Sequence, residues 1–284
     1  MILVVGATGT NGKEVVSRLS ALGTPVRALV RDPMRSKEIQ LPHVDIVKGD
    51  LDDAASLDAA LKDVDQAFLV PAVDQRQMQW CEAFIKAAQR ARTKHVVKFS
   101  GMGAGLDAQS EIMRLHGQSD DALIRSGLAY TILRPNSFFQ NLFWSAQSIK
   151  ERSAFYLPIG EARQSLVDVR DIASVAVSAL TTAGHEGKIH EITGRESLSM
   201  NDVAAAFSRV LGRLIQYVAV PLEAAKTGML EGGMPAWNAN ALTELYSVFA
   251  TGQYARMTDT IEKITGKKPA TFEGFAREFK AVFS

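Results

Sequence analysis

The amino-acid sequence predicts an α/β protein built on a doubly wound parallel sheet. Apolar runs rich in β-branched residues alternate with amphipathic helical stretches through the first half of the chain. Strands joined by helices of this length require right-handed crossovers and pair in parallel. The first apolar run also opens into glycines spaced three apart. With 284 residues, 46% of them hydrophobic, the chain can bury a substantial core.

The first predicted element is a strand over residues 2–5. These residues are apolar and partly β-branched, which is typical of a strand buried on both faces of a parallel sheet. Beyond Gly12 the apolar residues recur at helical spacing, which predicts a helix over residues 14–22 that ends at Gly23. The glycines therefore lie where a strand turns into a helix.

A turn of this kind predicts a dinucleotide site. Gly6 permits a tight turn, Gly9 lets the backbone approach a pyrophosphate, and Gly12 lets the helix pack close to the strand. The helix N-terminus then offers unpaired N–H groups to the phosphates. The candidate cofactor-binding residues of the turn are Gly6, Thr8, Gly9, Thr10, Asn11 and Gly12. A merely structural glycine turn is the alternative.

The following elements continue the alternation. Strands are predicted over residues 26–30, 44–47, 66–70, 95–99 and 129–133, and helices over residues 54–61, 75–91 and 109–126. This is the Rossmann architecture, in which the ligand binds at the carboxyl ends of the strands. The second half mixes helices over 172–180 and 200–211 with short strands over 189–193 and 217–220, and is mostly helical from residue 222.

Two domains are expected from this change of pattern. An NAD(P)-binding Rossmann domain is predicted over residues 1–150, and a smaller mixed α/β lobe that binds substrate over residues 151–284, with some elements interleaved beyond the boundary. A monomer or a homodimer is expected.

Charge and composition exclude several classes of function. Lys and Arg total 32 against 31 Asp and Glu, so nothing favours direct binding of nucleic acid or of an anionic membrane. The N-terminal apolar run is too short to span a bilayer. A single cysteine, Cys81, fits a reducing cytoplasm, where a small buried hydrophobe is its expected role. One cysteine and five scattered histidines give no metal-ligand spacing, so no metal is expected.

The residue after the second strand favours NADP(H), with NAD(H) possible. Arg31 stands where an acidic residue would bind the ribose hydroxyls, and Arg35 and Lys37 follow it closely. A guanidinium can hold a 2′-phosphate bidentately. The alternative is a solvated loop of charges, since Asp32 lies there too.

Other strand ends supply further candidates. Asp50 would accept from the adenine amino group, or would instead cap the next helix. Phe68 to Pro71 would line the ribose and pyrophosphate. Ser100 follows the fifth strand beside the expected nicotinamide, as a cofactor contact and a candidate catalytic hydroxyl. A serine is also a common turn former.

The chain resembles the NmrA-like branch of the atypical short-chain dehydrogenase/reductases. The motifs that carry the resemblance are Gly6-Ala-Thr-Gly9-x-x-Gly12, Arg31, Gly49-Asp50, Leu133-Arg134-Pro135-x-x-Phe138-x-x-Asn141, Val167-Asp168-Val-Arg-Asp171-Ile172-Ala173 and Thr265-Gly266-x-x-Pro269-x-Thr271-Phe272. They cover essentially the whole chain. The resemblance implies a reductase of quinones, azo or triphenylmethane dyes or iminium compounds, with Pro135 near the cofactor. The family also contains regulators that bind dinucleotide without catalysis.

One departure from ordinary short-chain dehydrogenases bears on mechanism. Those enzymes use a Tyr-x-x-x-Lys pair as proton donor, and no tyrosine of this chain has a lysine four residues on. His116 and Asp120 are four apart on the corresponding helix and share a face. The resemblance places His116 near the substrate, as a candidate catalytic residue, and Asp120 toward the cofactor. A half-exposed helix of polar residues is the alternative.

Aromatic residues after the sixth strand suggest a pocket for a flat acceptor. Phe138, Asn141 and Trp144 are the candidate substrate-binding residues. The aromatic residues expected beside them or closing the pocket are Phe139, Phe143, Phe155, Tyr156 and Trp237. Ordinary core packing is the alternative for any one of them.

The sequence therefore predicts an NADPH-dependent reductase of a flat conjugated acceptor, because quinones, cationic dyes and iminium ions accept hydride without a strong acid. The alternative is a non-catalytic redox sensor that binds NADP(H) and regulates a partner protein. An isomerase or lyase that keeps its cofactor is a third reading, against which the missing Tyr-x-x-x-Lys pair argues.

Overall fold

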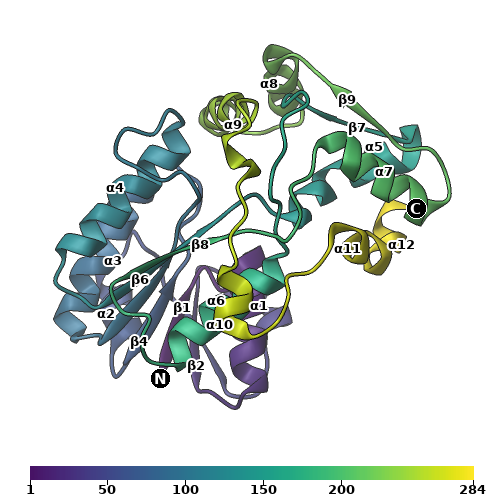
Figure 1. The fold of residues 1–284 in the computed structure, drawn as a ribbon. Helices are drawn as coiled ribbons and strands as arrows, with labels where there is room; N and C mark the ends of the chain where they lie inside the picture. Colours follow the sequence, from purple (N-terminus) through teal and green to yellow (C-terminus); the bar gives the residue numbers. More distant parts are fainter. The chain divides into compact units, whose positions relative to one another are not determined.

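A computed structural model describes residues 1–284, which divide into two compact units. The first comprises Met1–Ala108, Arg114–Arg134 and Ile172–Glu191, and the second comprises Gln109–Met113, Pro135–Asp171 and Ile192–Ser284 (Figure 1). Residues 172–191, beyond the predicted boundary at residue 150, belong to the first unit, and residues 135–150, before that boundary, belong to the second.

The first unit is built on a seven-stranded sheet of order β3-β2-β1-β4-β5-β6-β8. Its strands are β1 (Ile2–Val5), β2 (Val26–Val30), β3 (Val44–Lys48), β4 (Gln66–Leu69), β5 (His95–Phe99), β6 (Tyr130–Pro135) and β8 (Lys188–Ile192). β1 pairs in parallel with both β2 and β4, so the strand order reverses between β1 and β4. The predicted doubly wound sheet is confirmed, and its ligand crevice is expected at the carboxyl ends of these two strands.

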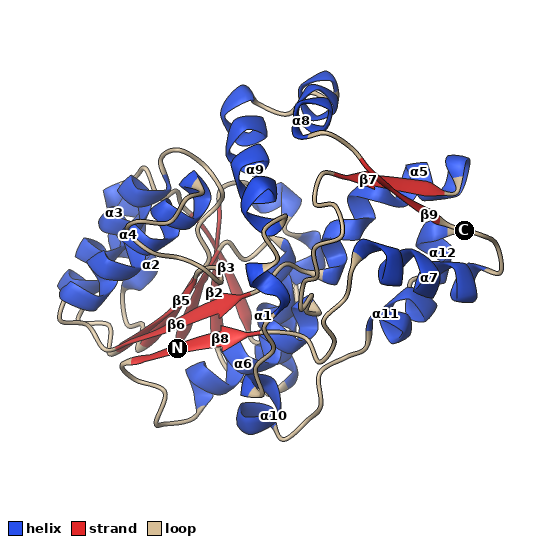
Figure 2. Ribbon diagram, turned by 45° about the horizontal axis from the view of Figure 1, so that its top comes forward, coloured by secondary structure: helices blue, strands red, loops and turns tan.

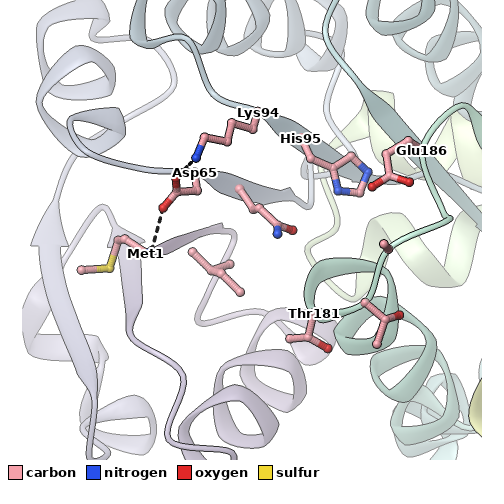
Figure 3. Close-up of a pocket in the computed structure, with 10 residues that line it drawn as sticks. Met1, Asp65, Lys94, His95, Thr181 and Glu186 are labelled. Atoms are coloured by element: carbon pink, nitrogen blue, oxygen red, sulfur yellow. Dashed lines mark hydrogen bonds and ion pairs between the residues drawn. The ribbon is translucent and has the colours of Figure 1, made fainter.

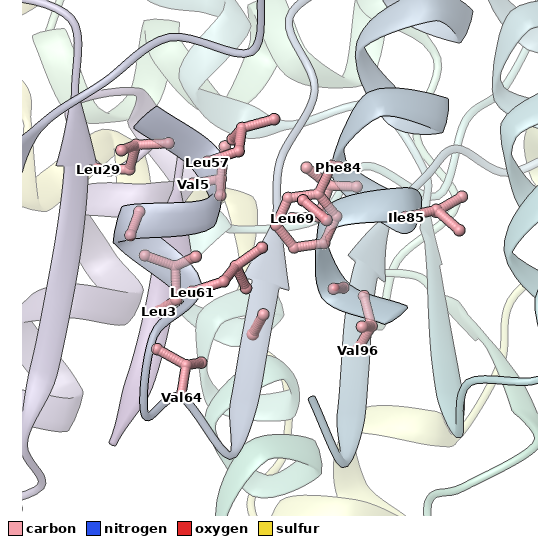
Figure 4. Close-up of a cluster of buried hydrophobic side chains, with 14 of the residues drawn as sticks. Leu3, Val5, Leu29, Leu57, Leu61, Val64, Leu69, Phe84, Ile85 and Val96 are labelled. Atoms are coloured by element: carbon pink, nitrogen blue, oxygen red, sulfur yellow. The ribbon is translucent and has the colours of Figure 1, made fainter. Parts of the chain in front are cut away.

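Helices cover both faces of this sheet (Figures 1 and 2). α1 (Thr10–Ala21) and α6 (Val169–Thr181) lie on one face, and α2 (Ala54–Leu61), α3 (Gln77–Ala91) and α4 (Glu111–Arg125) lie on the other. Under α2 and α3, strand residues such as Leu3 and Leu69 pack with Phe84 (Figure 4). This core holds the strand ends, and the residues that follow them, in fixed positions.

The second unit contains a small sheet and several helices. β7 (Ala154–Leu157), which the sequence analysis missed, pairs in parallel with β9 (Gln216–Ala219). The helices are α5 (Ala146–Arg152), α7 (Met200–Leu211), α8 (Leu222–Glu231), α9 (Ala236–Phe249), α10 (Thr260–Thr265), α11 (Phe272–Glu278) and α12 (Lys280–Phe283). The short 3-10 helices of the whole chain are η1 (Pro33–Arg35), η2 (Lys37–Ile39), η3 (Phe139–Ser145) and η4 (Gln253–Ala255).

Aromatic side chains form the core of this unit. Phe143 stacks on Phe283 at a centroid distance of 5.7 Å, and Phe139 meets Phe272 edge-on at 5.3 Å. Phe155 is fully buried and packs on Tyr217. The prediction that Phe139 and Phe155 lie beside a substrate is therefore wrong, because both rings are buried in this core. Phe143 packs against the core and is half-buried, and its predicted place beside a substrate stays a prediction.

No helix of the chain is both long enough and apolar enough to cross a bilayer.

Candidate functional site

Two glycines of the first turn are required by packing. Gly6 has φ +76°, and a Cβ there would lie 2.7 Å from the carbonyl oxygen of Val70. A Cβ on Gly12 would lie 2.1 Å from the carbonyl oxygen of Gly6. These contacts agree with the roles predicted for the two residues, a tight turn and a close approach of helix to strand.

Gly9 is different, because the fold does not demand a glycine there. Its backbone is extended, with φ −78° and ψ 167°, and a Cβ would meet only the carbonyl oxygen of Gly6, at 3.3 Å. Thr8, Gly9 and Thr10 are all exposed. The space beside Gly9 is therefore open to a ligand.

The start of α1 presents unpaired polar groups at this turn. Lys13 makes the first helical N–H bond, to the carbonyl of Gly9, so the N–H groups of Thr10, Asn11 and Gly12 have no intrahelical acceptor. Asn11 Oδ1 is buried and has no hydrogen-bond partner. Backbone N–H groups suit a phosphate, and the amide oxygen suits a ligand hydroxyl. The turn thus fits a phosphorylated nucleotide.

Basic residues at the end of β2 are available to such a ligand. Asp32 caps η1 by accepting from the N–H of Met34, and it makes no ion pair with Arg31. Arg31, Arg35 and Lys37 are exposed, and none of them makes an ion pair. This arrangement favours the 2′-phosphate interpretation of Arg31 over a loop of mutually paired charges.

The next two strand ends correct part of the sequence analysis. Asp50 does not cap α2, because Asp53 accepts the N–H groups of Ala55 and Ser56. Asp50 Oδ1 instead accepts the N–H of Asp52, and the side chain is half-buried. Phe68 is fully buried in β4. Its side chain therefore belongs to the core, and its contact with the cofactor stays a prediction.

Pro71 follows β4 and Pro135 ends β6, so both stand at carboxyl ends of strands as predicted. Both side chains are buried, which leaves them a role in shaping the backbone there.

A buried polar group of four side chains, here called the Asp120 cluster, lies at the carboxyl ends of β5 and β6. Asp120 Oδ1 accepts from Lys98 Nζ at 2.8 Å. Asp120 Oδ2 accepts from Ser100 Oγ at 2.9 Å and from Arg134 Nε and Nη2 at 3.0 and 2.9 Å. The carboxylate thereby holds two strands and α4 together.

His116 lies one helical turn before Asp120 and is 5% exposed. The side-chain amide nitrogen of Gln77 lies 3.2 Å from His116 Nδ1, within hydrogen-bond distance. Burial, and then the positive charge of Lys98, lower the pKa of His116 to about 3. Asp120 is buried too, so the alternative in which these two residues belong to the exposed, polar side of the helix is excluded. His116 is therefore a neutral hydrogen-bond donor.

Ser100 cannot supply a proton in this arrangement. Its hydroxyl donates to Asp120, so its oxygen is left with acceptor capacity only. Sequence reasoning named Ser100 and His116, but it missed Lys98 and Gln77. A lysine inside the apolar run Val96-Val97-Lys98-Phe99 was the available signal, because a buried lysine needs a partner.

The predicted substrate residues belong to the second unit. Asn141 is exposed and donates to Ser137 Oγ, and the Trp144 indole is 80% exposed. Phe138 is half-buried and bridges to Val167. None of these three side chains is fully buried, unlike Phe139 and Phe155.

A polar pocket of about 480 Å³ lies at the amino ends of the strands of the first unit's sheet (Figure 3). Ile2, Gln66 and His95 line it, and they stand at the amino ends of β1, β4 and β5. Parallel α/β sheets bind their ligands at the carboxyl ends of the strands. This pocket is therefore not the predicted nucleotide site.

Comparisons with known proteins agree with this picture. The model of the NmrA-like family matches residues 1–276. The chain is 43% identical over 283 residues to the NAD(P)H azoreductase of Xenophilus azovorans, covering 100% of this chain and 99% of that protein. It is 35% identical over 285 residues to the (4-alkanoyl-5-oxo-2,5-dihydrofuran-3-yl)methyl phosphate reductase of Streptomyces griseus subsp. griseus, with coverage of 100% and 99%.

A solved structure of an NADPH-dependent quinone oxidoreductase from Escherichia coli, complexed with NADPH, superposes with a TM-score of 0.90. The match has 23% sequence identity and covers 99% of this chain and 100% of that one. At this identity the likeness shows a shared fold.

Proposed function

The chain belongs to the NmrA-like family, and we propose that it is an NADPH-dependent reductase of flat conjugated acceptors, such as quinones, azo or cationic dyes, or iminium compounds. The azoreductase that shares 43% of its sequence with this chain supports the class of reaction. The reductase of a phosphorylated dihydrofuranone, 35% identical, supports conjugated acceptors more broadly.

The first unit would hold the cofactor. Backbone N–H groups from Thr10 to Gly12 would bind the pyrophosphate beside Gly9, and Arg31 would bind the 2′-phosphate. Asp50 would accept from the adenine amino group. Bound NADPH supplies the hydride.

The observation that carries the proposal is that neither predicted catalytic residue at the strand ends is a strong acid. His116 is neutral, and the Ser100 hydroxyl is already committed to Asp120. General acid catalysis contributes roughly 10²–10⁴-fold to a reduction that needs it. Acceptors that delocalise or neutralise the incoming negative charge lose least of this rate enhancement when no general acid is present. The neutral His116 would then donate a hydrogen bond to a developing oxyanion.

Phe138, Asn141 and Trp144 are proposed to contact the acceptor. The exposed indole of Trp144 offers a flat apolar face, and the amide of Asn141 offers a polar contact.

The proposed location is the cytoplasm. Cys81 is buried and forms no disulfide, which fits a reducing compartment.

A panel of acceptors tests the proposal. NADPH absorbance is followed with the purified protein and a quinone, an azo dye, a cationic dye or an unactivated ketone. We expect turnover of conjugated acceptors and little reduction of the ketone. Tight NADPH binding without turnover of any acceptor would contradict the proposal and favour the redox sensor.

A further inference from the structure

The Asp120 cluster carries more positive than negative charge. Lys98 and Arg134 each contribute one positive charge, and Asp120 contributes the single negative charge between them. The side chains of Lys98 and Asp120 are 0% and 2% exposed, and that of Arg134 is 20% exposed. Water therefore screens the excess charge weakly.

The groups packed around the cluster do not compensate the excess. On α4, His116 is neutral because burial holds its pKa at about 3. On α3, burial raises the pKa of the Cys81 thiol, which stays protonated. The neighbouring carboxylate of Glu82 is exposed to water. An excess of one positive charge is thus built into the interior of the first unit.

The place of this charge follows from the strands that carry it. Lys98 and Ser100 are two residues apart at the end of β5, so their side chains share one face. Arg134 is the penultimate residue of β6, and only its Nε and Nη2 bond to Asp120. These strand ends lie on the β4 side of the crevice that opens between β1 and β4, where the nicotinamide half of a dinucleotide would bind.

We propose that the excess positive charge of the Asp120 cluster selects against positive charge in the adjoining nicotinamide and acceptor site. The enzyme then prefers neutral acceptors, such as quinones and azo compounds, to cationic dyes and iminium ions. It also binds the reduced cofactor, whose nicotinamide ring is neutral, more tightly than the oxidised one. This inference rests on the proposed function for its acceptor half only.

The charge balance of the reaction gives the inference its direction. One hydride passes to the acceptor: a neutral acceptor becomes an anion that takes a proton from water, and a cationic acceptor becomes neutral. Compared with a neutral acceptor, a cationic acceptor brings one more positive charge into the site, both before and after hydride transfer. If the acceptor lies about 12 Å from the excess charge, an effective dielectric constant of about 20 gives a change in rate of about tenfold.

Variants that change the cluster charge in opposite directions test the inference. Lys98→Met removes a positive charge, and Asp120→Asn removes the negative one. The measured quantity is the ratio of kcat/KM for a neutral quinone to kcat/KM for a cationic dye. We expect it to fall about tenfold in Lys98→Met and to rise by up to about tenfold in Asp120→Asn, where partial deprotonation of the unpaired, buried Lys98 limits the rise. A role in folding alone would not move the ratio in opposite directions.

Binding supplies a second measurement that needs no turnover. The ratio of the Kd of NADP⁺ to that of NADPH, from calorimetry, should fall in Lys98→Met and rise in Asp120→Asn. Lys94→Met is the matched control, since Lys94 is exposed and pairs with Asp65 at the amino edge of the sheet. If Lys98→Met does not fold, Arg134→Gln also lowers the charge of the cluster by one unit, because it removes the other cation.

The outcomes separate the two proposals. Ratios that stay unchanged, or that move in the same direction in both variants, overturn the charge inference even if turnover is robust. Cofactor ratios that move as expected without turnover of any acceptor support the charge inference and overturn the proposed function.

Discussion

Replacing Gly9 by valine should abolish dinucleotide binding and leave the protein folded. The backbone at Gly9 has φ −78° and ψ 167°, which valine adopts readily. The new Cβ would meet only the carbonyl oxygen of Gly6, at 3.3 Å, so the cost to folding should stay within about 1 kcal/mol. The added methyl groups would instead fill the space that the pyrophosphate must enter.

The expected loss of affinity follows from the groups exposed at the turn. If two backbone N–H groups of α1 lose their phosphate contacts, each worth roughly 1.5–3 kcal/mol, the affinity falls by roughly 10²–10⁴-fold. Gly12→Ala is the matched control, because its Cβ would lie 2.1 Å from the backbone oxygen of Gly6. That variant should lose about 3 kcal/mol of stability or more.

Calorimetry with NADPH and thermal unfolding together decide the matter. The account predicts a folded Gly9→Val variant without measurable binding and a destabilised Gly12→Ala variant. Wild-type affinity in Gly9→Val would refute the reasoning, since the turn would then not be the phosphate site.

Three further predictions concern Arg31 and His116. Arg31→Ala should reduce the preference for NADPH over NADH, which we expect to be about tenfold or more in the wild type from a charge-assisted phosphate contact; equal affinities of the wild type for both cofactors would contradict the role of Arg31. His116 is neutral in the fold, with a pKa of about 3 against 6.5 ordinarily. Its contribution to the free energy of unfolding is therefore fully present above pH 6.5 and is lost as the pH falls from 6.5 toward 3. This loss amounts to roughly 4–5 kcal/mol in all. It should be smaller in His116→Gln when unfolding is measured between pH 7 and 4. Equal pH dependences of the wild type and the variant would show that His116 is not held neutral. His116→Ala should also slow the reduction of a neutral quinone more than that of a cationic dye, and stopped-flow traces with equal losses would assign His116 a packing role.

Local patterns predicted the first unit well. The predicted strands over residues 26–30 and 95–99 and the helix over 54–61 agree with β2, β5 and α2. Their apolar runs are buried and their ends are marked by turn residues, so neighbouring residues suffice to define them. The roles of Gly6 and Gly12 were readable for the same reason, since each depends on the geometry of a single turn.

Long-range packing was not readable. Phe139 and Phe143 looked like pocket aromatics because they follow a strand end, yet their partners Phe272 and Phe283 lie more than a hundred residues away. β7 was missed, and its partner β9 is distant in sequence. The Asp120 cluster likewise unites residues of β5, α4 and β6, which only the fold brings together.

The most direct test of the account is the rate of NADPH oxidation with a neutral azo dye or quinone, measured side by side for the wild type and Gly9→Val. The account predicts many turnovers in the wild type, one acceptor reduced for each NADPH consumed where the acceptor takes one hydride, and none in the variant. Binding of NADPH by the wild type with no oxidation in the presence of any such acceptor would contradict it.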